Sequence, residues 1–283
     1  MKAHFLRFCL LAGLLILSAC SGEKTVRIEG QERERPEADL HVAVVPTLDC
    51  LPIFFAHERG MFEARGVSVD LQQYDSQLDC DTALLSDWVD VAFADASRKA
   101  LLSQRGTGTS LCLETLGSWG IVCSPKVRLK SVKDLKDRTL AVARNSTSED
   151  LALSALRGAG INRSDVMFPL INAYNIRTDM VAQNQIDAAV LPEPFYAIAV
   201  ERGCKVLQAP QTREGEIVCK SKRAAELSAR LDKFCAVYED ATDSLRAQWP
   251  KIADFLFEKY FGTKYALGKK VSLPNAKPKE EIQ

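Results

Sequence analysis

Polar residues follow one apolar run of this sequence at a spacing that suits the binding of an anion. Four of them stand between the run Thr139–Ala143 and a helical pattern, in the order Asn145, Ser146, Thr147 and Ser148. The start of a helix offers free backbone N–H groups and the positive end of the helix dipole, which attract anions. Ser146 with Glu149 also fits a capping box, and Ser148 alone could cap the helix, so a purely structural interpretation stays open.

Acidic and aromatic residues at the ends of other predicted strands suit a different ligand. The remaining candidate ligand-binding residues are Thr47, Leu48, Asp49, Asp95, Asn172, Tyr174, Glu193 and Tyr196. A carboxylate at Asp49 or Asp95 would repel an anion, so the ligand should carry a cation or hydrogen-bond donors. Glu193 lies between two prolines near two tyrosines, which predicts a site that stacks a flat ring and binds its donors. In the alternative interpretation, Asp49 caps the next helix and Glu193 lies in a solvated turn.

Patterns that would indicate an enzyme, a metal site or a nucleic-acid-binding protein are absent from the sequence. His41 and His57 are too few and too scattered for a catalytic triad or a metal cage. No Gly-x-Ser-x-Gly, HExxH, P-loop, dinucleotide-binding glycine pattern or CxxC pair occurs. The 37 basic residues balance 37 acidic ones, which gives no basic excess for nucleic acid. We therefore expect no catalytic residue, no cofactor and no metal.

The N-terminus has the pattern of an export signal. Lys2 and Arg7 precede the apolar run Phe8–Leu17, which is about half the roughly 20 residues that a membrane-spanning helix needs. The following Leu-Ser-Ala-Cys resembles the bacterial lipobox, which predicts a signal peptide over 1–19 and a lipid on Cys20. The chain is then anchored in a bacterial cell envelope and faces the periplasm or the exterior. An ordinary secretory signal with a chance cysteine is the alternative.

Export gives meaning to the cysteines of the mature chain. Exported proteins oxidise such residues, so up to three disulfides and one free thiol are expected. Cys50 and Cys80 each follow Leu-Asp just beyond a predicted strand, and they are the preferred pair. Spacing alone does not assign the other partners. The disulfide candidates are Cys50, Cys80, Cys112, Cys123, Cys204 and Cys219, and Cys235 is the seventh cysteine.

The elements that must position these residues form two α/β halves. A strand over His41–Val45, a helix over Pro52–Phe62 and a strand over Val67–Tyr74 form a unit that places ligand sites at the carboxyl ends of its strands. The pattern restarts after residue 131. Two long amphipathic helices, Ala224–Glu239 and Thr242–Phe261, follow the second half. Shorter separate strands are predicted over Leu111–Leu116, Gly120–Ser124, Val166–Ile171, Lys205–Ala209 and Glu216–Cys219.

Three segments in this order resemble a known family. They are PTLDCLPIFFAHERGMFEARGVSVDL, ALLSDWVDVAFAD and QNQIDAAVLPEPFYAIA. The chain is similar to the substrate-binding proteins of ABC importers in the nitrate/taurine/sulfonate and thiamine-precursor group, although Trp88 stands where the family has a glycine. The resemblance implies an α/β, two-lobed type II periplasmic-binding-protein fold with a mixed, mainly parallel sheet in each lobe. Lobe one would comprise 41–125 and 213–262 and lobe two 126–210, with a flexible tether over 20–40 and a disordered tail over 263–283.

The resemblance also implies a function. The chain would be a monomeric, lipid-anchored protein that captures a small molecule between its lobes and delivers it to an ABC permease with its ATPase. Two alternatives stay open. One is a surface lipoprotein that uses the same fold for protein contacts. The other is an enzyme of related fold that makes a thiamine or menaquinone precursor, which the export signal argues against.

Overall fold

The computed structural model describes residues 35–273, except for the side chain of Lys99. The predicted signal peptide, Cys20 and most of the predicted tether lie outside the described residues. The described residues from 36 to 273 belong to one structural unit.

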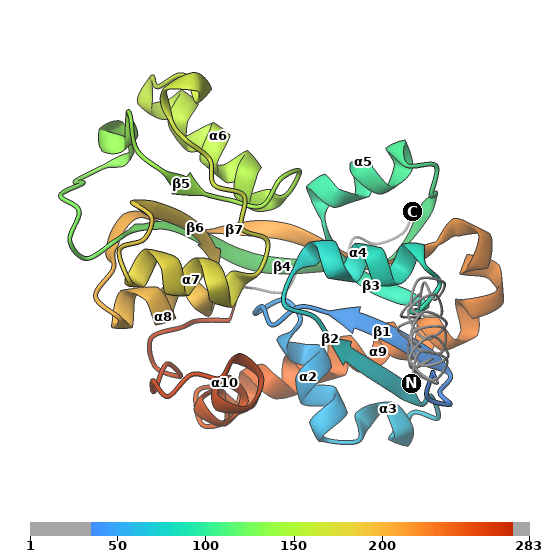
Figure 1. Ribbon diagram of the computed structural model, residues 1–283. Helices are drawn as coiled ribbons and strands as arrows, with labels where there is room; N and C mark the ends of the chain where they lie inside the picture. Colours follow the sequence, from blue (N-terminus) through green and yellow to red (C-terminus); the bar gives the residue numbers. More distant parts are fainter. Residues whose placement is uncertain (1–34, 274–283) are drawn as a thin grey trace, which may run out of the picture. The chain divides into compact units, whose positions relative to one another are not determined.

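A seven-stranded mixed sheet organises this unit, in the strand order β2-β1-β3-β7-β4-β6-β5 (Figure 1). The strands β1, β2 and β3 are mutually parallel, as are β5 and β6, and every antiparallel pairing involves β4 or β7. The strands are β1 (Leu40–Val44), β2 (Val69–Gln73), β3 (Val91–Asp95), β4 (Thr109–Cys123), β5 (Leu140–Ala141), β6 (Ala188–Pro192) and β7 (Lys205–Lys220).

Helices connect the parallel strands, as the alternating pattern predicted. The α-helices are α2 (Leu51–Glu58), α3 (Met61–Ala64), α4 (Gln77–Leu85), α5 (Ala96–Gln104), α6 (Thr147–Ala159), α7 (Tyr174–Ala182), α8 (Phe195–Glu201), α9 (Ala224–Gln248) and α10 (Ala253–Phe261). Short 3₁₀ turns cover Val132–Leu135, Arg163–Asp165 and Ser221–Arg223. None of the helices in the described range is long and apolar enough to cross a membrane.

The first strand shows why the sequence is folded this way. All five residues of β1 are buried, as expected for a strand that lies between two parallel neighbours. The helix predicted over Pro52–Phe62 is divided into α2 and α3, because Gly60 between them adopts a left-handed conformation with φ of 62°. The site residues that follow β1 are therefore held between a buried strand and a short helix.

The long strands β4 and β7 correct the prediction of shorter separate strands. Gly117, Ser118 and Trp119 continue β4, because each has a partner residue in β7. Residues between Ala209 and Glu216 continue β7 for the same reason. A glycine in a strand pattern need not end the strand if the backbone stays extended and paired. The two strands run through both predicted lobes and connect them.

Two further predictions are wrong in detail. Val166–Ile171 is not a strand, and it contributes only isolated bridges to residues 139 and 142. Pro169 lies within it and has no N–H to donate to a ladder. The predicted end of the first long helix at Glu239 is also wrong, because Ala241 and Leu245 keep the buried face of α9 intact beyond that residue. The helix ends at Gln248, just before Pro250.

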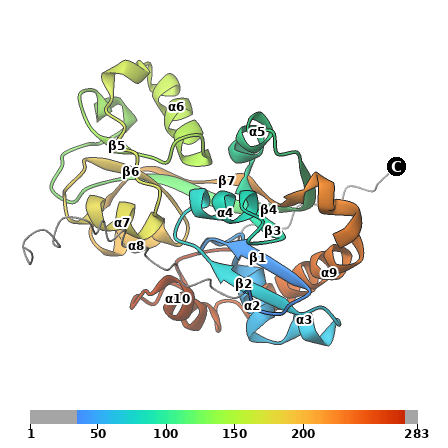
Figure 2. The ribbon, with the colours of Figure 1, turned by 45° about the vertical axis from the view of Figure 1, so that its right-hand side comes forward.

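The helix α9 lies beside α2 and α3 in both views (Figure 2). The rings of Phe62 and Phe234 stack between α3 and α9 with centroids 5.2 Å apart. Beyond α10 the predicted disordered tail is also corrected in part. Leu267 and Val271 are buried, and the indole of Trp249 donates a hydrogen bond to the Val271 carbonyl over 3.0 Å. The rest of that tail, 274–283, lies outside the described residues.

Candidate ligand-binding site

The predicted anion site is a capped helix N-terminus. Ser146 is the N-cap of α6, and its hydroxyl accepts from the Ser148 N–H over 3.2 Å and donates to the Ala143 carbonyl over 2.8 Å. The Ser148 hydroxyl accepts from the Ala143 N–H over 2.9 Å. Asn145 is exposed, and its N–H donates to the Glu149 carboxylate over 2.7 Å. The two serine hydroxyls therefore serve the turn itself.

Asp95 occupies the position that the sequence suggested for an anionic ligand. It ends β3 and caps α5, where it accepts a hydrogen bond from the Arg98 N–H over 3.2 Å. Its other carboxyl oxygen accepts from the Thr147 N–H at the start of α6 over 3.0 Å. Burial raises the pKa of Asp95 to about 7, more than these hydrogen bonds lower it. A carboxyl group of the chain itself thus lies on the helix N-terminus.

The loop after β1 brings a second buried acid into the same region. Asp49 accepts a hydrogen bond from the Thr115 hydroxyl of β4 over 3.3 Å, and burial raises its pKa. The hydroxyl of Thr47 lies beside it, buried and without a well-formed hydrogen bond in the described structure. Gly215 makes room for this arrangement, since a β-carbon there would lie 2.6 Å from the Thr115 hydroxyl and 2.8 Å from Asp49 Oδ2.

Glu193 meets this loop from the other predicted lobe. Its carbonyl accepts from the Leu48 N–H over 3.2 Å, and its N–H donates to the Ser118 carbonyl of β4 over 2.8 Å. Its carboxylate accepts from the Ala197 N–H over 3.2 Å, and burial raises its pKa to about 7. Burial and the nearby charge of Glu193 raise the pKa of Tyr196 to about 12. The structure therefore brings Leu48, Glu193 and Tyr196 together.

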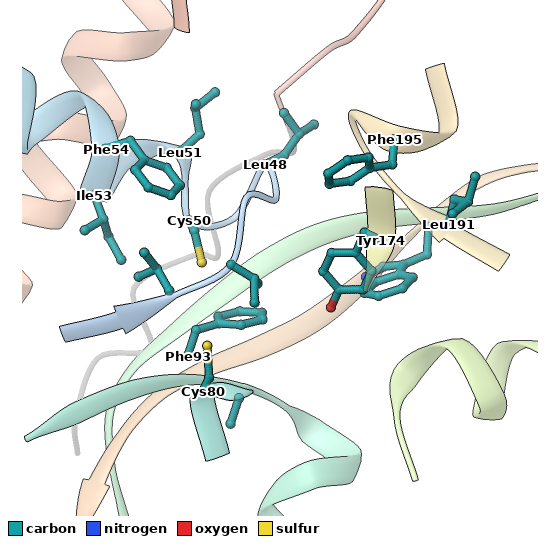
Figure 3. Close-up of a cluster of buried hydrophobic side chains, with 14 of the residues drawn as sticks. Leu48, Cys50, Leu51, Ile53, Phe54, Cys80, Phe93, Tyr174, Leu191 and Phe195 are labelled. Atoms are coloured by element: carbon teal, nitrogen blue, oxygen red, sulfur yellow. The ribbon is translucent and has the colours of Figure 1, made fainter. Parts of the chain in front are cut away.

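Buried aromatic rings pack beside these acids. The ring centroid of Tyr174 lies 5.8 Å from that of Trp119 and 5.7 Å from that of Phe195. Figure 3 shows Tyr174 and Phe195 as neighbours, with Leu48 near them. The three rings are at most 5% exposed. In the structure Tyr174 contacts the other two rings, so stacking of a ligand ring between them stays a prediction.

Two buried arginines were missed from the sequence. The Arg177 guanidinium is fully buried and donates to the carbonyls of Ile171, Val190 and Asn172, and burial lowers its pKa to about 10. The half-buried Asn172 therefore contributes its backbone carbonyl to this contact. Arg98 forms a buried salt bridge with an acid of α4, Asp81. The sequence feature that could have identified Arg177 as buried is its position three residues after Tyr174, on the buried face of α7.

The charges of the region disfavour a bare anion. Asp49, Asp95 and Glu193 are buried, and none forms a salt bridge with a side chain that the structure describes. The two buried arginines are already engaged by an acid and by carbonyls. Within residues 35–273 no group of His, Cys, Asp and Glu could hold a metal ion. The arrangement is suited to a ligand with hydrogen-bond donors or a positive charge.

A separate surface hollow contains none of the predicted site residues. Its volume is about 500 Å³. It lies between α2, α9 and α10, and its lining residues are Glu58, Arg59, Gln248, Lys251, Ile252 and Phe255.

The predicted disulfides are not formed in the structure. All seven cysteines of the described range carry free thiols. Figure 3 shows the sulfur atoms of Cys50 and Cys80 pointing toward one another. Both side chains are fully buried, and burial raises the pKa of both thiols. The pairing of Cys50 with Cys80 stays a prediction.

Comparisons with known proteins agree on the fold. The family model described as NMT1/THI5 like matches residues 47–248. The periplasmic aliphatic sulphonate binding protein SsuA from Escherichia coli has 19% sequence identity and a TM-score of 0.65, and the match covers 82% of this chain and 80% of that one. No curated protein matches the sequence closely enough to be reported as a relative.

Two further solved structures have the same fold. The alkanesulfonate-binding protein SsuA from Xanthomonas axonopodis pv. citri, bound to MOPS, has 17% identity and a TM-score of 0.69, with 83% of each chain covered. The periplasmic nitrate-binding protein NrtA from Synechocystis PCC 6803 has 13% identity and a TM-score of 0.68, with 81% of this chain and 68% of that one covered. The predicted periplasmic-binding-protein fold is confirmed.

Proposed function

Since the chain belongs to the NMT1/THI5-like family, we propose that it is a lipid-anchored solute-binding protein that captures a small molecule for an ABC importer. The family and the structural neighbours are substrate-binding proteins and not enzymes, which agrees with the absence of catalytic patterns in the sequence. Capture rests on closure of two lobes around the solute and involves no covalent step. A permease with its ATPase would then receive the closed form.

The chemistry of Asp49, Asp95 and Glu193 supports a solute with hydrogen-bond donors or a positive charge. Asp95 already lies on the N-terminus of α6, where a sulfonate or nitrate would have to bind. Above about pH 7, where Asp95 is ionised, an anion in that place would meet a carboxylate, and close like charges repel strongly in a buried setting. The buried Thr47 hydroxyl adds a polar group with no well-formed hydrogen bond of its own. The assigned ligand class rests on one observation, the hydrogen bond from the Thr147 N–H to the Asp95 carboxyl group.

Direct contacts hold the two predicted lobes together. The Thr147 N–H donates to Asp95, the Leu48 N–H donates to the Glu193 carbonyl, and the Arg98 guanidinium donates to the Arg144 carbonyl over 3.1 Å. These bonds join residues of 41–125 to residues of 126–210. A solute would replace or bridge some of them. The strands β4 and β7 remain as the connections about which the lobes open.

The lipid anchor belongs to the proposal as well. The apolar run before Leu-Ser-Ala-Cys supports it, and Cys20 would carry the lipid. With the lipid in the membrane, residues 20–40 would join the anchor to the domain. Such an arrangement keeps a binding protein near its permease at the surface of one membrane.

Calorimetric titration of the mature chain tests the ligand class. Basic amino acids, aminopyrimidines and flavins form one group of ligands, and alkanesulfonates with nitrate form the other. We expect binding from the first group, weakened roughly tenfold or more by Glu193→Gln or Asp49→Asn, because each removes a charged hydrogen-bond acceptor. Asp243→Asn, an exposed position on α9, is the matched control and should bind as the parent does.

Other results would contradict the proposal. Tight binding of simple sulfonates alone would refute the assigned ligand class. A chain that binds nothing in either group and shows no thermal shift would instead favour a surface lipoprotein that uses the fold for protein contacts. The direct hydrogen bonds between residues of 41–125 and residues of 126–210 are the observation that favours this second function.

A further inference from the structure

The chain after α10 lies beside a helix of the other predicted lobe. Residues 263–273 were expected to belong to a disordered tail, yet Leu267 and Val271 are buried. Figure 1 shows this segment running from α10, in predicted lobe one, toward α8, in predicted lobe two. The segment itself belongs to neither predicted lobe. It therefore links two parts of the fold that the sequence treated as separate.

Hydrogen bonds and close packing hold the segment on predicted lobe one. The indole of Trp249, the residue after α9, donates to the Val271 carbonyl over 3.0 Å. The Gly268 N–H donates to the Asp254 carboxylate of α10 over 2.7 Å. A β-carbon at Gly268 would lie 3.0 Å from the Pro250 carbonyl oxygen, so the backbone approaches the start of α10 closely. The segment is thus anchored on the helices of lobe one.

Both ends of α8 contact this C-terminal region. At the last residue of the helix, Glu201 Oε1 lies 2.6 Å from Lys270 Nζ. At its first residue, the ring of Phe195 packs edge-on against the ring of Phe261, with centroids 6.3 Å apart. Contacts at two separate points fix the direction of a short helix as well as its place.

The Phe261 ring contacts both predicted lobes. Besides Phe195 of α8, it packs edge-on against Phe54 of α2, with centroids 6.5 Å apart. Edge-to-face ring pairs at such distances attract one another beyond the effect of buried area. The helix α2 directly follows the loop that carries Leu48. One side chain therefore joins α8 to the helix beside this loop of the candidate site.

We propose that residues 261–271 form a strap that positions α8, and with it Glu193 and Tyr196 of the candidate ligand-binding site. Lys270 and Phe261 are the positioning residues of this strap. Glu193 lies two residues before α8, and Tyr196 lies in its first turn. The inference rests on the proposed function, because these two residues are candidate contacts to the solute. It adds a connection between the predicted lobes besides β4 and β7.

One hydrogen bond reports whether the residues before α8 are in place. The Leu48 N–H donates to the Glu193 carbonyl over 3.2 Å, and Leu48 is 2% exposed. Its amide hydrogen exchanges with solvent when this bond breaks, so a strap that holds α8 slows the exchange. The amides of β1 lie in a buried strand between two neighbours and exchange only on wider unfolding. The two sets of amides separate local release of α8 from a general loss of stability.

Hydrogen exchange of the mature chain, refolded without solute and followed by NMR, tests the strap. Lys270→Glu replaces an attraction by a repulsion and should raise the exchange rate of the Leu48 amide about threefold, while the rates of the β1 amides stay unchanged. The factor is modest because the Lys270 side chain is 55% exposed. Lys269→Glu is the matched control, since this exposed neighbour forms no ion pair within residues 35–273, and it should exchange as the parent does.

Two further variants test the pairing and the ring contact. Adding Glu201→Lys to Lys270→Glu restores opposite charges and should return the Leu48 rate to that of the parent. Phe261→Leu removes the ring contact to α8 and should raise the Leu48 rate relative to the rates of the β1 amides.

Three results would overturn the proposal. In the first, Lys270→Glu exchanges at Leu48 no faster than Lys269→Glu does. In the second, the Leu48 and β1 amides speed up by the same factor. In the third, the double variant exchanges at Leu48 as fast as Lys270→Glu alone. Because no solute is used, failure of the strap leaves the proposed ligand class untouched, and a chain that binds no solute leaves this test intact.

Discussion

Replacing Asp95 with asparagine removes the charge that the structure places on the N-terminus of α6. In the folded chain the pKa of Asp95 rises from 3.8 to about 7 because the side chain is buried. The folded state therefore holds the proton more tightly than the unfolded chain does. Between these two pH values the free energy of unfolding falls as the pH rises, because the unfolded state binds fewer protons than the folded state.

The size of the effect follows from the shift. The pKa of Asp95 rises from 3.8 to about 7, and each unit of pKa corresponds to about 1.4 kcal/mol. Up to about 4 kcal/mol of unfolding free energy is therefore present at low pH and is lost as the pH rises to 7. In Asp95→Asn this loss disappears. The amide oxygen can still accept from the Arg98 N–H, but the bond from the Thr147 N–H is lost, which costs about 1 kcal/mol. The charge of Arg98 lowers the pKa of Asp95, and that of Asp81 raises it, and both remain in the variant.

Urea unfolding followed by circular dichroism measures the effect on either side of the shifted pKa, at about pH 5 and about pH 8. The variant should be within about 1 kcal/mol of the parent at the lower pH, because pH 5 already lies above the unfolded pKa of 3.8, and up to about 3 kcal/mol more stable at the higher pH. Asp243→Asn, an exposed acid, is the control and should follow the parent. If parent and Asp95→Asn lose the same stability between the two pH values, the placement of a buried titrating carboxyl at this contact is wrong.

Three other changes give distinct outcomes. Gly215→Ala forces a β-carbon to within 2.6 Å of the Thr115 hydroxyl, so denaturant unfolding should show a loss of about 1–3 kcal/mol. Arg177→Leu leaves the buried carbonyls of Ile171 and Val190 without a donor, which should lower the free energy of unfolding by about 2–4 kcal/mol in the same assay. Arg157→Leu, at an exposed position, is the control and should change it little. Equal effects of the two substitutions would refute the buried role of Arg177. Cys20→Ser should move the chain from the membrane fraction to the soluble envelope fraction, and an unchanged distribution would contradict lipidation.

The parallel strands were predictable because their patterns are local. β3 is an apolar run that ends in an acid, and β1 is a continuous apolar run that lies within one residue of its predicted bounds. The start of α6 was equally clear, because Ser146 is a strong N-cap residue and Gly160 closes the helix in a left-handed conformation. Local signals of this kind predicted the alternating strands and helices, whereas the two-lobed fold was expected from the family resemblance.

The long strands could not be read locally. Gly117-Ser118-Trp119 has the composition of a turn, yet cross-strand pairing with β7 keeps it extended. The contact between Asp95 and Thr147 joins residues 52 positions apart in the sequence, so no periodicity reports it. Arg177 was missed because arginine is seldom fully buried, and the carbonyls of Ile171 and Val190 explain its place. The candidate site was therefore predicted as a set of residues, whereas its internal hydrogen bonds were not.

Native mass spectrometry of the mature chain, purified without refolding, tests the central claim most directly. We predict that the folded chain carries one small molecule, that denaturation releases it, and that it has a positive charge or several hydrogen-bond donors. Glu193→Gln should be recovered with less of it, and Asp243→Asn with the same amount as the parent. A folded parent chain that is consistently empty, or that carries only an inorganic anion or a simple sulfonate, would contradict the account.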